Sequence, residues 1–330
     1  MATGRRTSAI KGQLRYSRGD LAAPPFGLEG IDSWHVSCDT RLCYHDIMQS
    51  AALILLVGST MFPLPTPEAE TAGRSLPAYE LTVWPGWHET YDHTVEQVVR
   101  SACDELMQYY PERQFRPISV MFRHEGVPQI FYEGGPRGQH TKDVVLLTAR
   151  SRFWCQYVYQ FAHEHCHILH NADLPYPHEA GWLNESLSEM ASLFVLRALS
   201  ERWKRQPPFP GWESFAPNLA EYTEPILEKA AIPDDVSLAD WYTTHKEALR
   251  ADPINRELNA VVACRLLPWF EESPGHWEAL TWLHHRRDAL QGRTLTFAEV
   301  LVEWEHQCPS RHKALVRRIA DEFGVACEFE

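Results

Sequence analysis

The spacing of hydrophobic residues changes along this chain and divides it into three parts. Residues 1–36 are rich in Arg, Ser, Gly and Pro and show no apolar period, so we expect a flexible arm there. Residues 37–205 combine strand-like and helical patterns, whereas residues 206–330 show helical patterns almost throughout. We therefore predict an α+β domain over 37–205 followed by an all-α domain over 206–330.

Individual elements can be placed within these parts. A continuous apolar segment at 41–60 favours a buried helix, and the prolines that follow favour an exposed loop at 63–77. Apolar residues at period 2 or in short runs predict strands, and an apolar stripe at period 3.6 predicts a helix. The remaining expected elements are a helix at 94–110, strands at 117–123, 128–132 and 144–148, and helices at 152–170, 183–203, 219–231, 237–250, 254–272, 276–290, 296–307 and 311–323.

Composition narrows the class of protein. An apolar content of 44% and 12 tryptophans argue for a folded globular chain. A net charge of −13 argues against general affinity for nucleic acid or for an anionic membrane, so no nucleic-acid partner is expected. The eight cysteines form no CxxC pair, and reduced, buried thiols in a cytoplasmic protein are the simplest interpretation.

One apolar run, Ala51–Val57, bears on targeting. It is too short to span a bilayer, so no membrane span is expected. It would suit an export signal if translation began at Met48, but the basic residues that normally precede such a segment are missing. Cytoplasmic placement is the prediction, with export as the alternative.

The candidate chemistry begins in the predicted helix at 152–170. His163-Glu164-x-x-His167 places two imidazoles one helical turn apart on one face, a spacing that can hold a zinc ion with Glu164 beside it. Catalytic zinc needs a third protein ligand and an open position for water. The next predicted helix offers Glu185, and Glu189 one turn later could accept a hydrogen bond from the outer nitrogen of His163.

These two segments together resemble the gluzincin metallopeptidases, the class of thermolysin and the aminopeptidase-N-type enzymes. The resemblance rests on HExxH followed by Trp182-Leu-Asn-Glu-Ser-Leu-Ser-Glu189, and it covers about residues 117–200. It implies a zincin-like catalytic domain and one Zn²⁺ per chain. It also implies His163, His167 and Glu185 as ligands, Glu164 as general base and Glu189 as the acid behind a ligand. The three strands before the motif fit, since in this class a sheet edge binds the substrate backbone.

A second resemblance involves the whole run from His163 to His170. It is similar to the HExxHxLLH of the IrrE/ImmA-type regulatory peptidases, including those of phage-defence operons. Both resemblances imply a zinc-dependent peptidase, and we expect an endopeptidase whose partner is a protein or peptide substrate, such as a specific regulatory protein. The alternative is a regulatory or binding protein with a latent, degenerate or structural zinc site. The presence of Glu164 favours the enzyme, because a structural site needs no base.

The donor that would stabilise the oxyanion is not determined by the pattern. His178, eleven residues after His167, is the first candidate, and the others are Tyr176, Tyr222, Tyr242 and His245.

The remaining polar residues near the motif are expected to be supporting residues. His165 faces away from the ligand pair, and Cys166 is expected to be a small buried hydrophobe. His170 is expected to be structural, with a place behind the ligands or on the substrate side as the alternatives. A thiolate could also cap the open zinc position in a latent state, and the upstream candidates are Cys38, Cys43 and Cys103. The run at 284–287, His-His-Arg-Arg, is expected to be a solvated helix edge.

Overall fold

The computed structural model describes residues 76–134, 140–172, 178–284 and 294–329, all within one compact unit, Thr66–Glu330. The expected arm at 1–36 and helix at 41–60 lie outside these residues. One hydrophobic core runs from Leu81 to Phe323 and includes residues on both sides of position 205. Near residue 205 the described chain thus changes from mixed strands and helices to helices alone, within one core. The predicted domains at 37–205 and 206–330 stay a prediction.

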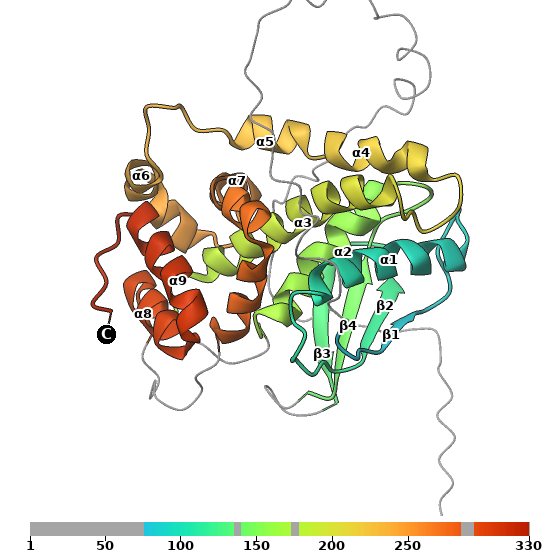
Figure 1. Cartoon of the computed structure of the whole chain (residues 1–330), viewed down its shortest axis with the longest axis horizontal. Coiled ribbons are helices and arrows are strands. Elements are labelled where there is room, and N and C mark those ends of the chain that lie inside the picture. Colours follow the sequence, from blue (N-terminus) through green and yellow to red (C-terminus); the bar gives the residue numbers. More distant parts are fainter. Residues whose placement is uncertain (1–75, 135–139, 173–177, 285–293, 330) are drawn as a thin grey trace, which may run out of the picture. The chain divides into compact units, whose positions relative to one another are not determined.

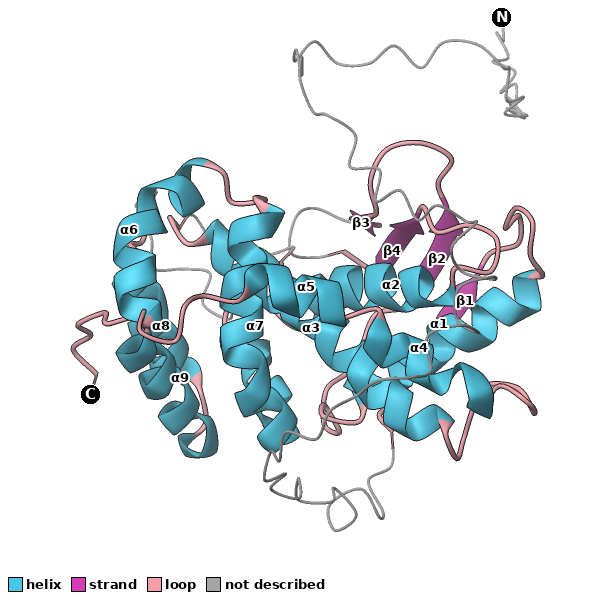
Figure 2. Ribbon diagram, turned by 90° about the horizontal axis from the view of Figure 1, so that it is seen from above, coloured by secondary structure: helices cyan, strands magenta, loops and turns pink. Residues whose placement is uncertain are grey.

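The described part is an α+β structure with a small mixed sheet near its start and helices after it (Figures 1 and 2). The first elements are β1 (Leu81–Val83), α1 (Asp92–Met107), β2 (Ile118–Phe122), β3 (Gln129–Glu133), β4 (Lys142–Leu147), α2 (Trp154–Leu169) and α3 (Gly181–Trp203). The helices that follow are η2 (Glu213–Phe215), α4 (Ala216–Glu221), α5 (Glu224–Ala230), α6 (Leu238–Ala251), α7 (Arg256–Glu272), η3 (Pro274–Trp282), α8 (Phe297–Gln307) and α9 (Ser310–Glu322).

The sheet has the strand order β1-β2-β4-β3. The first three strands in this order are parallel, and β3 runs antiparallel to β4 at the edge, with Ile130 opposite Val145. The inner strands β2 and β4 carry apolar side chains that are fully buried, such as Val120 and Val145. The edge strand β3 alternates between exposed and half-buried residues, as expected for a strand that is covered on one face only.

Helices α2 and α3 form the centre of the structure. Helix α2 packs on the sheet, on α1 and on α3, while α3 also packs on α4 and α7. In both views α3 lies between the sheet and the C-terminal helices (Figures 1 and 2). Buried residues occur on all sides of α3, from Trp182 to Trp203, which is the pattern of a helix enclosed in a core. Side chains that α2 and α3 direct at each other are therefore held by packing from several elements.

Most predicted elements are confirmed, and the differences have local causes. Strand β1 was not predicted, because three residues are too few to show a period. The predicted helix at 219–231 is two helices, α4 and α5, since Pro225 has no N–H to continue the first helix through Thr223. The predicted helix at 276–290 is a 3₁₀ helix, Pro274–Trp282, where it is described.

Candidate metal centre

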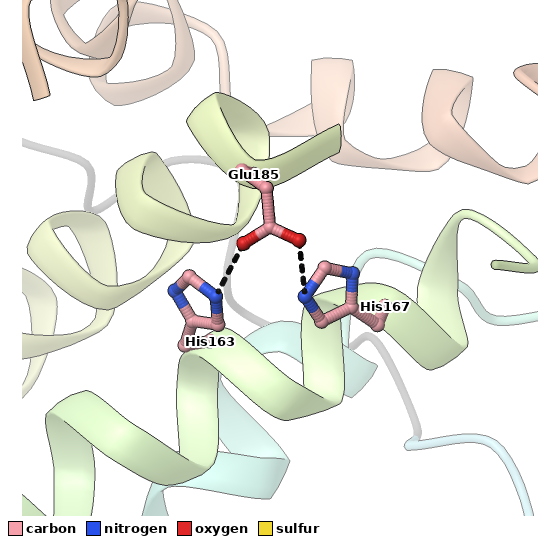
Figure 3. A group of neighbouring side chains, drawn as sticks. All are labelled: His163, His167 and Glu185. Carbon is pink, nitrogen blue, oxygen red and sulfur yellow. Dashed lines mark hydrogen bonds and ion pairs between the residues drawn. The ribbon is translucent and has the colours of Figure 1, made fainter. Parts of the chain in front are cut away.

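Three side chains from two helices converge at the centre of the structure. Helix α2 contributes His163 and His167, one turn apart, and α3 contributes Glu185 (Figure 3). The Glu185 carboxylate lies between the two imidazoles, with Oε2 3.3 Å from Nε2 of His163 and Oε1 3.6 Å from Nε2 of His167. The sequence prediction that these three residues meet is confirmed by this geometry.

The donor set fits a metal ion. A ring nitrogen of His163, a ring nitrogen of His167 and a carboxylate oxygen of Glu185 all lie within 4.8 Å of one another. Tetrahedral zinc with bonds of about 2.0–2.1 Å separates its ligand atoms by roughly 3.3 Å. The Glu185 distances of 3.3 Å to His163 and 3.6 Å to His167 are near that value, and the two imidazole nitrogens lie within 4.8 Å of each other. The side chains of His163, His167 and Glu185 are 13%, 11% and 26% exposed, so solvent reaches the cluster. Two imidazoles and one carboxylate can hold a metal ion, and this partial exposure leaves access for water.

The charges of these three side chains change one another's pKa values. Burial opposes the charge on His163, but its hydrogen bond to Glu185 and the nearby carboxylates together raise the pKa of the imidazole above its usual value. Burial also disfavours the Glu185 carboxylate, and the two histidines outweigh that effect and lower the pKa of Glu185 to about 2. Burial lowers the pKa of His167 to about 4, which leaves a neutral imidazole. The anionic Glu185 and the neutral His167 are in the forms that bind metal, whereas a protonated His163 must release its proton when metal binds.

Glu164 lies beside this cluster, and its side chain is buried. Burial raises the pKa of Glu164 to about 7, while His163 and a hydrogen bond from the backbone N–H of Ile130 act in the opposite direction. A carboxyl with a pKa near neutrality can both accept and return a proton. Ile130 belongs to the edge strand β3, so the carboxyl of Glu164 lies between the candidate ligands and the edge of the sheet.

Behind His163 the structure places a carboxylate and a tyrosine. Oε2 of Glu189 lies 3.9 Å from Nδ1 of His163, an ion-pair distance that is longer than the predicted hydrogen bond. The hydroxyl of Tyr159 donates to Oε1 of Glu189 at 2.6 Å. Tyr159 was missed from the sequence, although it lies four residues before His163 and hence on the same face of α2.

Behind His167 the structure places a histidine instead. Nδ1 of His167 lies 3.2 Å from Nε2 of His170 and 3.4 Å from the Ser188 hydroxyl. His170 is fully buried, as is His165, whose ring packs against Phe161 on the far side of the helix. The expected packing role of His165 is confirmed, and His170 directly contacts a candidate ligand.

Asn184 and His284 form a contact that joins residues far apart in the sequence. Asn184 Oδ1 lies 2.9 Å from Nε2 of His284. The expectation of a solvated helix edge at 284–287 is wrong for His284, which is 2% exposed, and residues 285–287 lie outside the described part. The His284 ring also lies 5.4 Å from the His170 ring and 5.2 Å from the His178 ring, centroid to centroid.

The structure places the oxyanion candidates in different surroundings. Nδ1 of His178 accepts a hydrogen bond from the Ala180 N–H at 3.1 Å, and burial lowers the pKa of its ring to about 4. His178 thus presents Nε2–H as a donor, and its role at an oxyanion stays a prediction. Tyr222 packs near Tyr159, while Tyr242 packs against Trp182.

His245, another oxyanion candidate, is held by its own helix α6. His245 donates to the carbonyl of Trp241 at 2.7 Å through Nδ1 and stacks on that tryptophan ring. Tyr176 lies outside the described residues.

The cysteines near the site are packing residues where they are described. Cys166 is fully buried, as expected of a small hydrophobic residue, and its thiol also donates to the carbonyl of Leu187 at 3.5 Å. Cys103 is fully buried in the core on α1, and burial raises the pKa of its thiol well above the usual value. Cys38 and Cys43 lie outside the described residues, so a thiolate cap from either stays a prediction.

A membrane span needs a helix of sufficient length and hydrophobicity. In the described parts of the chain, every helix is too short or too polar to cross a bilayer. Comparisons of the chain with protein-family models, with curated proteins and with solved structures give no match.

Proposed function

We propose that this protein is a zinc-dependent peptidase of the gluzincin type, with His163, His167 and Glu185 as the zinc ligands. The observation that supports the proposal is the position of Glu164, a buried carboxyl beside the cluster that accepts a hydrogen bond from the backbone N–H of Ile130 on the edge strand. A structural metal site needs only ligands, whereas hydrolysis also needs a group that moves protons at neutral pH.

The residues have complementary roles in this proposal. Bound zinc supplies Lewis-acid polarisation of the scissile carbonyl and lowers the pKa of a bound water. Glu164 accepts a proton from the attacking water on a carboxylate oxygen and returns it to the nitrogen of the leaving amine. Because β3 is the edge strand of the sheet and its Ile130 contacts Glu164, an extended peptide can add to this edge with its backbone near the base.

The substrate in this proposal is a protein or peptide that binds in extended form. The chain's net charge of −13 makes a nucleic acid an unfavourable partner. The same charge favours cleavable segments that are not themselves strongly acidic, because like charges raise the cost of association.

The first test measures metal. Purified protein is expected to hold about one zinc per chain, and Glu185→Gln is expected to lower zinc affinity by at least about tenfold, because one of three ligands loses its charge. Glu201→Gln is the matched control, since Glu201 is an exposed residue on the same helix, paired with Lys204. Equal zinc affinity in the parent and Glu185→Gln would contradict the assigned ligand set.

The second test measures cleavage. Labelling of new protein N-termini in the native cell, with the parent compared to Glu164→Gln, should show termini that depend on Glu164. Rate losses for removal of a general base are typically about 10²–10⁴-fold. A zinc-loaded parent that yields the same termini as Glu164→Gln would exclude the peptidase and favour a regulatory protein with a structural zinc site.

A further inference from the structure

Two candidate ligands on the same helix have different partners behind them. His163 has the carboxylate of Glu189 near its outer nitrogen, while His167 has the imidazole of His170 at 3.2 Å. A carboxylate can only accept when ionised, whereas a neutral imidazole has one donor and one acceptor nitrogen. The role of His170 therefore depends on which of its nitrogens carries the proton.

Coordination determines the proton position on His167. Both histidines direct Nε2 at Glu185, so Nε2 is the nitrogen that would bind metal. A neutral imidazole that binds metal through Nε2 carries its proton on Nδ1. The Nδ1–H of His167 then donates, and the acceptor nearest to it is Nε2 of His170.

His170 has its own proton on the nitrogen that faces away from His167. If its Nε2 accepts, its own proton lies on Nδ1, where the buried nitrogen has no hydrogen-bond partner among the described residues. The neighbouring ring is that of His284, whose Nε2 must donate because Asn184 Oδ1 can only accept. Nδ1 of a neutral His284 is then an acceptor, in a ring 5.4 Å from that of His170. The donor and acceptor roles of the three rings therefore do not conflict: His167 donates to His170, and His284 donates to Asn184.

We propose that His170 is a positioning residue that fixes the metal-binding tautomer and orientation of His167. The inference rests on the metal site of the proposed function, but it does not require that the site cleave peptides. Groups that accept from the outer nitrogen of a ligand histidine contribute about 10–100-fold to metal affinity. An imidazole that accepts through one nitrogen carries no negative charge, unlike a carboxylate, so His170 orients His167 without adding negative charge to a site that already holds Glu164, Glu185 and Glu189.

A pair of substitutions separates hydrogen bonding from packing. In His170→Gln the amide oxygen can take the place of Nε2 as acceptor, so zinc affinity is expected to stay within about threefold of the parent. In His170→Leu the acceptor is lost, so zinc affinity is expected to fall about 10–100-fold, measured by competition with a chelator. The unfolding temperatures of the zinc-free proteins show whether each variant folds.

Two further variants complete the comparison. His165→Leu removes an equally buried histidine of α2 whose ring packs on Phe161, and it should keep parental zinc affinity. Ser188→Ala removes the more distant acceptor at 3.4 Å and should also have little effect. A fall in Ser188→Ala with none in His170→Leu would overturn the proposal, as would equal falls in His165→Leu and His170→Leu.

A direct measurement does not depend on the variants. Nitrogen NMR of the zinc-loaded parent, with histidines labelled, should show His170 protonated on Nδ1 and accepting at Nε2. A proton on Nε2 of His170 would overturn the proposal. A parent that binds no zinc refutes both this inference and the proposed function. A parent that binds zinc and cleaves nothing, with the expected loss in His170→Leu, refutes the function alone.

Discussion

At the scale of single residues, the position of a side chain along helix α2 determines whether it faces the candidate metal ligands or the core. Its period of 3.6 directs Tyr159, His163 and His167 to one face and His165 to another. The first face meets Glu185 and Glu189 of α3, and the other meets the core. Neighbouring histidines of similar chemistry thus have unrelated roles.

The hydrogen bond from Tyr159 to Glu189 gives a prediction at this scale. Glu189 is buried, and Tyr159→Phe removes a donor that supports its carboxylate. We expect the free energy of unfolding of the zinc-free protein to fall by about 1–3 kcal/mol, the cost of leaving a buried acceptor unsatisfied. Urea denaturation measures this difference.

Tyr157→Phe is the matched control on the same helix. The Tyr157 side chain is fully buried, and its hydroxyl has no hydrogen-bond partner among the described residues. Removal of that hydroxyl should leave stability unchanged or raise it slightly, because an unsatisfied polar group is replaced by an apolar ring. Equal losses for the two variants would show that the bond to Glu189 contributes nothing specific.

At the scale of elements, the helix ends differ in how they are capped. The two central helices, α2 and α3, have no side-chain cap at their N-termini, and packing stabilises them instead. Helix α8 has a capping box, in which Thr296 accepts from the Glu299 N–H and Glu299 accepts from the Thr296 N–H. This end lies at the surface, where local hydrogen bonds matter more than burial.

Thr296→Ala should therefore destabilise the protein. We expect a loss of about 1 kcal/mol in the free energy of unfolding, because the N–H of Glu299 loses its side-chain acceptor. Thr296→Ser keeps the hydroxyl and should recover most of the loss. If the serine variant were as unstable as the alanine variant, packing of the threonine methyl group rather than capping would be responsible.

At the scale of the whole molecule, one buried carboxyl joins distant helices. Glu105 of α1 accepts from Arg202 of α3 at 2.9 Å and from the Gln108 side chain at 2.8 Å. Burial raises the pKa of Glu105 from 4.5 to about 7, against the opposing effects of these two partners. The group lies in the core that α1 shares with α3, so its ionisation acts on the stability of the whole fold.

The sign of the pH dependence follows from that shift. Between about pH 4.5 and pH 7 the unfolded chain loses the proton of Glu105 while the folded protein keeps it, so stability falls as the pH rises through this window. At about 1.4 kcal/mol per pKa unit the fall attributable to Glu105 is about 3 kcal/mol. Above pH 7 this contribution is constant.

Glu105→Gln isolates this effect. The difference in unfolding free energy between parent and Glu105→Gln should change by about 3 kcal/mol between pH 5 and pH 8, in the direction that makes the variant relatively more stable at pH 8. Urea denaturation at the two pH values measures it, and Glu201→Gln, an exposed carboxylate of α3, should give no such change. A difference that is independent of pH would show that Glu105 is ionised throughout.

Local pattern in the sequence was sufficient for most helices, for strands β2, β3 and β4, and for the meeting of His163, His167 and Glu185. These features follow from periodicity within one element or from two helices joined by a short loop. Strand β1 is too short to show a period, and Pro225 interrupts the single helix predicted there, so local pattern predicted neither feature correctly.

The tertiary structure alone decided the surroundings of the candidate ligands. Tyr159 of α2 donates a hydrogen bond to Glu189 of α3, and His284 contacts Asn184, which lies 100 residues earlier in the sequence. Nothing in the spacing of these residues predicts such contacts, because they depend on how separate elements pack in space. The sequence by itself determined which residues could bind a metal, and packing decided that an imidazole, His170, lies behind His167 while a carboxylate lies behind His163.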